Sequence, residues 1–145
     1  MKPEHHIIIS LVLSIIFYLF TKSVFGLISV FLVGIFIDLD HIIDFWIENK
    51  KIIFTIREFF DYFYKHEYTK AYIFFHSIEF IPIMFILGNI FLGKIITYGI
   101  LFGFTTHILL DYTGNGSKPL TYFLTYRIYK KFDVSCFCRC KECQK

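Results

Sequence analysis

Charged residues are scarce in this chain, and four long apolar stretches hold almost none of them. Asp, Glu, Lys and Arg make up 19% of the 145 residues, whereas 56% of the residues are hydrophobic and the mean hydropathy is +0.59. A soluble domain of this size could not bury so much apolar surface, because small domains leave a large share of their surface exposed. The composition therefore argues against an ordinary soluble domain and predicts one membrane domain.

The N-terminal apolar run lacks the small residues at which a signal peptide is cleaved. Lys2 precedes the run at residues 7–20, but Thr, Lys and Ser follow it at residues 21–23. We therefore expect this segment to be retained as a helix. The net charge is only +3, so the charge gives no reason to expect a nucleic-acid partner.

The apolar stretches predict an all-α, polytopic membrane protein with four transmembrane helices, at about residues 5–20, 24–46, 71–92 and 95–112. The turns at residues 21–23 and 93–94 are too short for anything but antiparallel neighbours. Residues 1–133 would form this membrane domain, and residues 134–145 would form a cysteine-rich cytoplasmic tail.

Residues 48–70 separate the second and third stretches and mix charge with aromatic residues. Phe59 and Phe63 are four positions apart, as are Phe60 and Tyr64. This spacing predicts an amphipathic helix on the cytoplasmic membrane surface or across the end of the bundle. An aromatic face that only packs on the protein explains the pattern equally well.

The positions of Lys and Arg predict the topology. Thirteen of the fifteen basic residues fall in the N-terminus, in residues 48–70 or after residue 117, and only Lys22 and Lys94 lie in the two short turns. Under the positive-inside rule, this distribution puts both termini in the cytoplasm. We expect a multi-pass protein of a prokaryotic inner membrane, in contact with membrane lipid.

Ionisable side chains gather at the cytoplasmic ends of the predicted helices. The ionisable side chains at these ends are His6, Asp38, Asp40, His41, His76, Glu79, His107 and Asp111. Burying an ionisable group at membrane depth costs free energy, so such residues usually indicate a functional site. His107 and Asp111 are four positions apart, and His76 and Glu79 are three apart, so each pair would share a helix face. Asp38 and Asp40 would point about 200° apart on a regular helix, so both can join one cluster only where the helix ends.

Imidazole and carboxylate ligands favour Zn²⁺, with Mn²⁺ or Fe²⁺ as weaker options, and this number of candidates suits two ions. The predicted metal ligands are His6, Asp38, Asp40, His41, His76, His107 and Asp111. Glu79 and Asp40 are the candidate catalytic carboxylates, with Glu79 as a general base or further ligand. Asp40 or Asp111 would bridge the two ions, and His6 would complete the ligand set or support a ligand from behind. Such a centre suits hydrolysis of phosphoesters, and its level at the headgroups favours lipid-linked substrates.

Two alternatives stay open from the residues alone. Each pair, taken by itself, could be a neutralised polar contact, and only the shared depth of all the pairs favours metal. A metal-binding membrane protein without catalysis, such as a sensor, scaffold or transporter subunit, is the second alternative. A transporter should carry polar residues near mid-membrane and on both sides, whereas Asn89 stands alone in the outer half.

These motifs resemble the YdjM-like family of membrane-bound metal-dependent hydrolases, distant relatives of zinc-dependent phospholipase C. The residues that carry the resemblance are His6 with Ser10, the FIDLDH motif at residues 36–41, His76 with Ser77, and the HILLD motif at residues 107–111 followed by Thr113, Gly116 and Pro119. Ile37 stands where the family has proline, and the family's His-Arg pair is missing, since His66 is followed by Glu67. The resemblance covers roughly residues 5–125 and implies a membrane-embedded hydrolase site.

All the cysteines of the chain lie in its last ten residues. They are Cys136, Cys138, Cys140 and Cys143. A cytoplasmic tail is in a reducing compartment, so structural disulfides are not expected. A second, structural metal site, S-palmitoylation near the membrane, or an unstructured tail with reactive thiols each fits the pattern.

Overall fold

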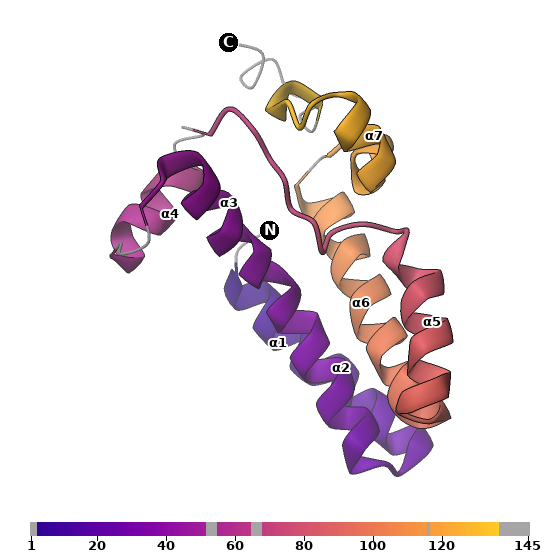
Figure 1. Ribbon diagram of the computed structural model, residues 1–145. Helices are drawn as coiled ribbons and strands as arrows, with labels where there is room; N and C mark the ends of the chain where they lie inside the picture. The colour runs from indigo at the N-terminus through magenta and orange to yellow at the C-terminus, as the bar shows by residue number, and fades with distance from the viewer. Residues whose placement is uncertain (1–2, 52–54, 65–67, 116, 137–145) are drawn as a thin grey trace. The chain divides into compact units, whose positions relative to one another are not determined.

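The computed structural model describes residues 3–51, 55–64, 68–115 and 117–136 (Figure 1). These residues are mainly helical, and an isolated antiparallel bridge joins Lys70 and Asp133. The prediction of an all-α fold is therefore confirmed. The chain folds as two compact units. The first comprises Met1–Ile37 and Ile78–Asn115, and the second comprises Asp38–Ser77 and Gly116–Lys145.

The first unit contains two antiparallel helical hairpins. Its helices are α1 (Pro3–Thr21), α2 (Val24–Phe36), α5 (Phe80–Phe91) and α6 (Lys94–Gly114). α1 packs on α2, α5 packs on α6, and α2 also packs on α6; Figure 1 shows α5 and α6 side by side. Lys22 (φ 53°) and Gly93 (φ 82°) make the left-handed turns. The Ser23 hydroxyl accepts the N–H of Gly26 at 3.2 Å and so caps α2.

Glycines on α6 allow α6 to approach the backbone of α2 closely. A methyl group added at Gly103 would lie 2.6 Å from the carbonyl oxygen of Val30, and one added at Gly99 would lie 2.9 Å from that of Gly26. Gly99 and Gly103 are one helical turn apart, so they form a single smooth stripe. Small residues at such a contact are typical of membrane helices, which associate through close packing rather than the hydrophobic effect.

Among the described residues, three helical stretches are long and apolar enough to cross a membrane: Glu4–Thr21, Val24–Asn49 and Lys94–Gly114. The second runs from α2 through a 3₁₀ turn, η1 (Ile37–Leu39), into α3 (Asp40–Asn49). Large apolar side chains point outward from the first unit; Phe20 is 85% exposed and Phe91 75% exposed. A surface of this kind fits lipid better than water, so length, composition and surface all indicate a membrane protein.

The third predicted helix is shorter than expected. The sequence predicted a helix over residues 71–92, whereas α5 spans Phe80–Phe91. Residues 71–79 are not helical. As shown below, side chains of the second unit bind backbone groups of Tyr72, Ile73, Phe75 and His76 that a helix would have paired internally. His76 therefore lies before the helix and Glu79 occupies its N-cap position. The expectation that these two residues share a helix face was wrong.

The second unit is built on short elements around a non-helical segment. It contains α3, α4 (Ile56–Tyr64), residues 68–77, η2 (Pro119–Tyr122), α7 (Leu124–Tyr129) and η3 (Val134–Cys136). The N–H of Ala71 donates to the carbonyl oxygen of Phe132 at 2.9 Å, and that of Val134 donates to Thr69 at 3.1 Å. Residues 68–77 are thus tied to the end of the described chain.

The aromatic face of α4 packs on α3. The rings of Tyr62 and Phe59 lie 5.1 and 5.9 Å from the ring of Phe45. The Tyr62 hydroxyl donates to the Glu48 carboxylate at 2.5 Å. Burial, together with this hydrogen bond, raises the pKa of Tyr62, so the phenol remains a neutral donor. These contacts support packing on the protein as the role of Phe59 and Tyr62.

Candidate metal-binding clusters

The first unit contains a buried polar cluster formed by the start of α1 and the end of α6. Its members are His6, His107 and Asp111, which are 2%, 1% and 4% exposed. Asp111 contacts both imidazoles: its Oδ1 lies 3.1 Å from His6 Nε2, and its Oδ2 lies 3.4 Å from His107 Nε2. The two rings stack with their centroids 4.2 Å apart. We call these three residues the first cluster.

The first cluster continues the glycine stripe of α6. Gly99, Gly103, His107 and Asp111 recur every four residues, so they follow one face of the helix. All four are buried. The two glycines bring α6 against α2, and one turn later the His107 ring meets the backbone of α2 at Gly34. Close helix packing thus places the ligand candidates at the end of the same interface.

The hydrogen bond to Gly34 defines the protonation of the His107 ring. His107 Nδ1 lies 2.8 Å from the carbonyl oxygen of Gly34, and because a carbonyl can only accept, Nδ1 carries the proton. The Nε2 of the neutral ring then presents a lone pair to the Asp111 carboxylate. Two lone pairs facing each other are favourable only when a cation, either a proton or a metal ion, lies between them. An imidazole whose second nitrogen donates to a carbonyl is the usual state of a metal-binding histidine.

The second unit contains a second cluster, formed by Asp38 of η1, Asp40 and His41 of α3, and His76. His76 Nδ1 lies 3.0 Å from Asp40 Oδ2, and His76 Nε2 lies 3.4 Å from Asp38 Oδ1. His41 Nε2 lies 3.8 Å from the same Asp38 oxygen. The 3₁₀ turn η1 interrupts the helix at Asp38, which is the interruption that Asp38 and Asp40 need to contact one imidazole.

The chemistry of the second cluster fits a metal ion. Asp40, His41 and His76 each offer a ligand atom within 4.8 Å of the others. Asp40 Oδ2 accepts the N–H of Phe75 at 2.9 Å as well as contacting His76. Asp40 Oδ1 is buried and has no hydrogen-bond partner among the described residues. A buried carboxylate oxygen without a donor is costly, and a cation at this oxygen would remove the cost.

The first cluster supplies two imidazoles and a carboxylate, the common ligand types for Zn²⁺. His6 faces Asp111 through Nε2, which lies 3.1 Å from Asp111 Oδ1, and its buried Nδ1 has no hydrogen-bond partner among the described residues. The second cluster can hold a divalent cation, and the identity of the ion stays a prediction. Metal binding by the first cluster is likewise a prediction.

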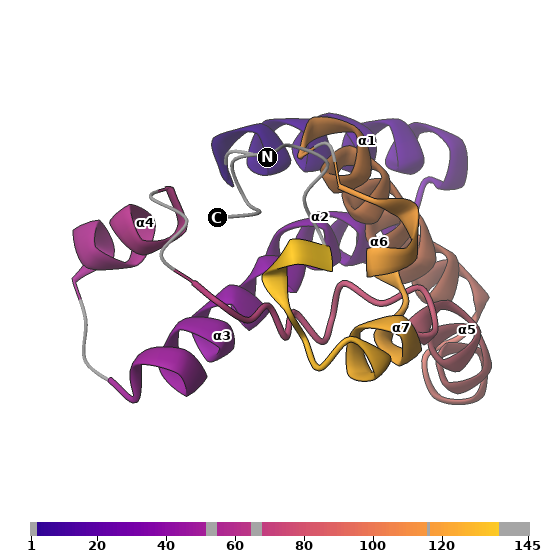
Figure 2. The ribbon, with the colours of Figure 1, turned by 90° about the horizontal axis from the view of Figure 1, so that it is seen from above.

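Segment 68–77, which carries His76, is held between α3 and α7 (Figure 2). On the α3 side, the Asp44 carboxylate accepts the N–H groups of Tyr72 at 3.1 Å and Ile73 at 3.0 Å. On the α7 side, Arg127 donates to the carbonyl oxygens of the same two residues at 2.6 and 2.5 Å. These bonds satisfy the backbone that a helix would have paired internally.

Arg127 also reaches the residues of the second cluster themselves. Its guanidinium lies 3.4 Å from the carbonyl oxygen of His76 and donates to the Ser77 hydroxyl. The side chain is fully buried. A planar guanidinium carries five donors in a fixed fork, so one arginine can bind several carbonyl oxygens at once. Arg127 therefore orients His76 from its backbone.

Asp44 and Arg127 support the site but were not predicted from the sequence. Asp44 lies one turn after Asp40 on α3, so the four-residue spacing was a usable signal. Arg127 lies between Tyr126 and Ile128 in an aromatic segment, but it was counted only as one more cytoplasmic charge. No local pattern relates Arg127 to His76, which is 51 residues away.

The remaining predicted site residues fall outside these two clusters. Glu79 is half-buried at the start of α5, and its role as a base stays a prediction. His66, Cys138, Cys140, Cys143 and the side chain of Cys136 lie outside the described residues. Comparisons with family models, with curated proteins and with solved structures found no match for this chain. The resemblance to the YdjM-like family therefore remains a prediction from the motifs alone.

Proposed function

We propose that this chain is a membrane-embedded, metal-dependent hydrolase of phosphoester or lipid-linked substrates, with Zn²⁺ as the favoured ion. One repeated arrangement carries the proposal: in each cluster, an imidazole with Nδ1 held by an oxygen presents Nε2 to a carboxylate oxygen 3.4 Å away. In the first cluster the imidazole is His107, and in the second it is His76. Such preparation of Nε2 by an acceptor at Nδ1 is the hallmark of a metal ligand.

The residues have separate proposed roles. His6, His107 and Asp111 hold one ion, and His41, His76 and Asp38 hold a second. Asp40 fixes the His76 ring through Oδ2, and its buried Oδ1 would be a further ligand of the second ion. Glu79 and Asp40 are the carboxylates that take the proton of the attacking water. A divalent ion supplies Lewis acidity, which lowers the pKa of water and offsets the negative charge that develops on a phosphoester.

The proposal includes the membrane topology inferred from the basic residues, with both termini and the ligand residues on the cytoplasmic side. α5 would provide the fourth crossing. Its 12 residues rise only about 18 Å, less than the roughly 30 Å of a bilayer core. The bilayer would therefore be thinned beside α5, or the non-helical residues before α5 would complete the crossing inside the protein.

Elemental analysis of the detergent-purified chain tests metal binding. We expect two ions per chain in the wild type and a loss of one ion in His6→Ala, because His6 is a buried member of the first cluster. His5→Ala is a matched control, since His5 is adjacent but exposed. We expect His76→Ala to lose the other ion. A folded wild type without bound metal would refute the proposal.

Hydrolysis is tested separately from metal binding. The loaded protein is assayed with a soluble aryl phosphodiester and with phosphatidylglycerol, and we expect turnover that His6→Ala and His76→Ala each abolish while His5→Ala keeps it. Two bound ions without turnover of either substrate would favour the alternative, a metal-binding membrane protein without catalysis.

A further inference from the structure

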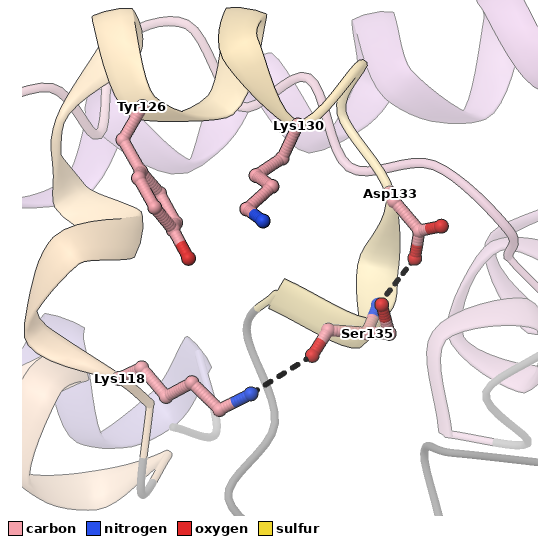
Figure 3. A pocket seen from close by; sticks show the side chains of 5 residues that line it. All are labelled: Lys118, Tyr126, Lys130, Asp133 and Ser135. Carbon is pink, nitrogen blue, oxygen red and sulfur yellow. Dashed lines mark hydrogen bonds between the residues drawn. The ribbon is translucent and has the colours of Figure 1, made fainter.

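A hollow separate from both clusters lies in the C-terminal part of the second unit (Figure 3). Its volume is about 320 Å³, and the residues that line it are Lys118, Tyr126, Lys130, Asp133 and Ser135. A volume at the lower end of the range for ligand pockets suits a small ligand or a single polar headgroup.

Hydrogen-bond donors converge on this hollow. Figure 3 shows the Tyr126 hydroxyl and the Lys130 ammonium directed into it from α7 and the residue that follows α7. Tyr126 and Lys130 are four positions apart, so they share a face, whereas Arg127 binds segment 68–77. The Lys118 ammonium donates to the carbonyl oxygen of Ser135 at 3.1 Å, and an ammonium group has two further N–H donors.

Among the described residues, Asp133 is the one carboxylate that lines the hollow. It accepts the backbone N–H of Ser135 at 2.8 Å. Hydrogen bonds from Ser135 lower the pKa of Asp133, so this group stays anionic and bound to its own turn. The two ammonium groups of Lys118 and Lys130 outweigh this single carboxylate, so the described lining keeps a net positive charge.

We propose that this hollow binds a phosphoryl group. Two ammonium groups and a phenol match an anion that has several acceptor oxygens and a charge between −1 and −2. Only three residues separate Lys118 from Gly114, the end of a candidate membrane span. The donors of the hollow could bind either the phosphate of a lipid headgroup or a free phosphate. Basic pockets close in the chain to a membrane span commonly bind anionic lipid. The proposal does not depend on metal binding or on hydrolysis.

The test uses the full chain, treated with a chelator and purified in a neutral detergent. Calorimetry measures binding of inorganic phosphate and of short-chain phosphatidylglycerol, with short-chain phosphatidylcholine as the zwitterionic comparison. Lys118→Gln and Lys130→Gln should each weaken binding about tenfold or more, the effect expected for the loss of one charge-assisted hydrogen bond. Tyr126→Phe should weaken binding to a smaller degree.

Lys131→Gln is the matched control, because Lys131 is adjacent to Lys130 and has the same charge but does not line the hollow. We expect this variant to bind like the wild type. Equal weakening by Lys131→Gln and Lys130→Gln would show diffuse surface charge instead of a site and would overturn the proposal, as would a wild type that binds neither phosphate nor phosphatidylglycerol. If binding is present, tighter binding of phosphatidylglycerol identifies a lipid headgroup, and equal or tighter binding of inorganic phosphate identifies a soluble phosphate.

Discussion

Replacement of Arg127 by methionine should release the segment that carries His76. The guanidinium is fully buried and donates to the carbonyl oxygens of Tyr72 and Ile73 at 2.6 and 2.5 Å, and it also contacts the carbonyl oxygen of His76 and the Ser77 hydroxyl. Methionine retains an apolar stem of similar length but has no donor. Several buried oxygens would therefore lose the partner that holds them.

The size of the effect follows from these contacts. A hydrogen bond from a charged donor contributes about 1.5–3 kcal/mol, but bonds that share one guanidinium do not add independently. A buried oxygen left without its donor costs about 1–3 kcal/mol, and the carbonyl oxygens of Tyr72 and Ile73 both lose their donor. We therefore expect the free energy of opening of residues 69–77 to fall by about 3–5 kcal/mol in all. Arg127→Lys should lose about half as much, because lysine retains the charge and three donors but not the planar fork.

Hydrogen exchange of the detergent-purified chain measures this local opening. The N–H groups of Ala71, Tyr72, Ile73 and Phe75 are all hydrogen-bonded, to Phe132, Asp44 or Asp40. Because each 1.4 kcal/mol is a factor of ten, their protection should fall by a factor on the order of 10²–10⁴ in Arg127→Met. Peptides from α6 serve as the internal reference.

Unchanged protection of residues 69–77 in Arg127→Met would refute the role assigned to Arg127. A loss of protection over the whole chain would mean that Arg127 supports the fold in general, and the reasoning would fail in that case also. Arg127→Lys separates the loss of hydrogen-bond donors from the loss of the planar guanidinium. If the donors hold the segment, lysine should keep part of the protection; if the planar geometry is essential, lysine should lose as much protection as methionine.

Three further predictions address packing, topology and pH. Gly103→Leu should destabilise the first unit by about 1–3 kcal/mol, since the new side chain would collide with the backbone of α2; a thermal melt unchanged from the wild type would contradict this. In intact cells, a membrane-impermeant maleimide should label Lys22→Cys but not Lys118→Cys, and the reverse result would invert the topology. The ammonium of Lys51 holds the pKa of Glu58 at about 2, below its usual 4.5. The ionised Glu58 carboxylate therefore stabilises the start of α4 fully above pH 4.5, and this stabilisation is lost as the pH falls through about 2. Amide exchange at the start of α4 should show this loss in the wild type and not in Glu58→Gln.

Local patterns were sufficient to predict α1, α2 and α6 of the first unit and the positions of its turns. Helices α1, α2 and α6 follow uninterrupted apolar runs, and the turns at Lys22 and Gly93 leave no room for other connections. The same local reasoning failed for residues 71–79, which are as apolar as a helix. Asp44 and Arg127 bind the backbone of Tyr72 in this segment, although they are 28 and 55 residues away from it in the sequence. A hydropathy pattern contains no information about such distant hydrogen-bond partners.

The sequence by itself determined that this chain is all-helical and apolar enough for a membrane, and which imidazoles and carboxylates stand at the ends of its apolar runs. Those properties depend on the spacing of side chains within one helix, so a linear pattern contains them. The tertiary structure alone decided that the carbonyl oxygen of Gly34 accepts a hydrogen bond from His107 Nδ1, that Asp40 holds the ring of His76, and that Arg127 supports this histidine from its backbone. A hydrogen bond between distant segments depends on which donors and acceptors remain once the helices have packed, and only the folded chain specifies that.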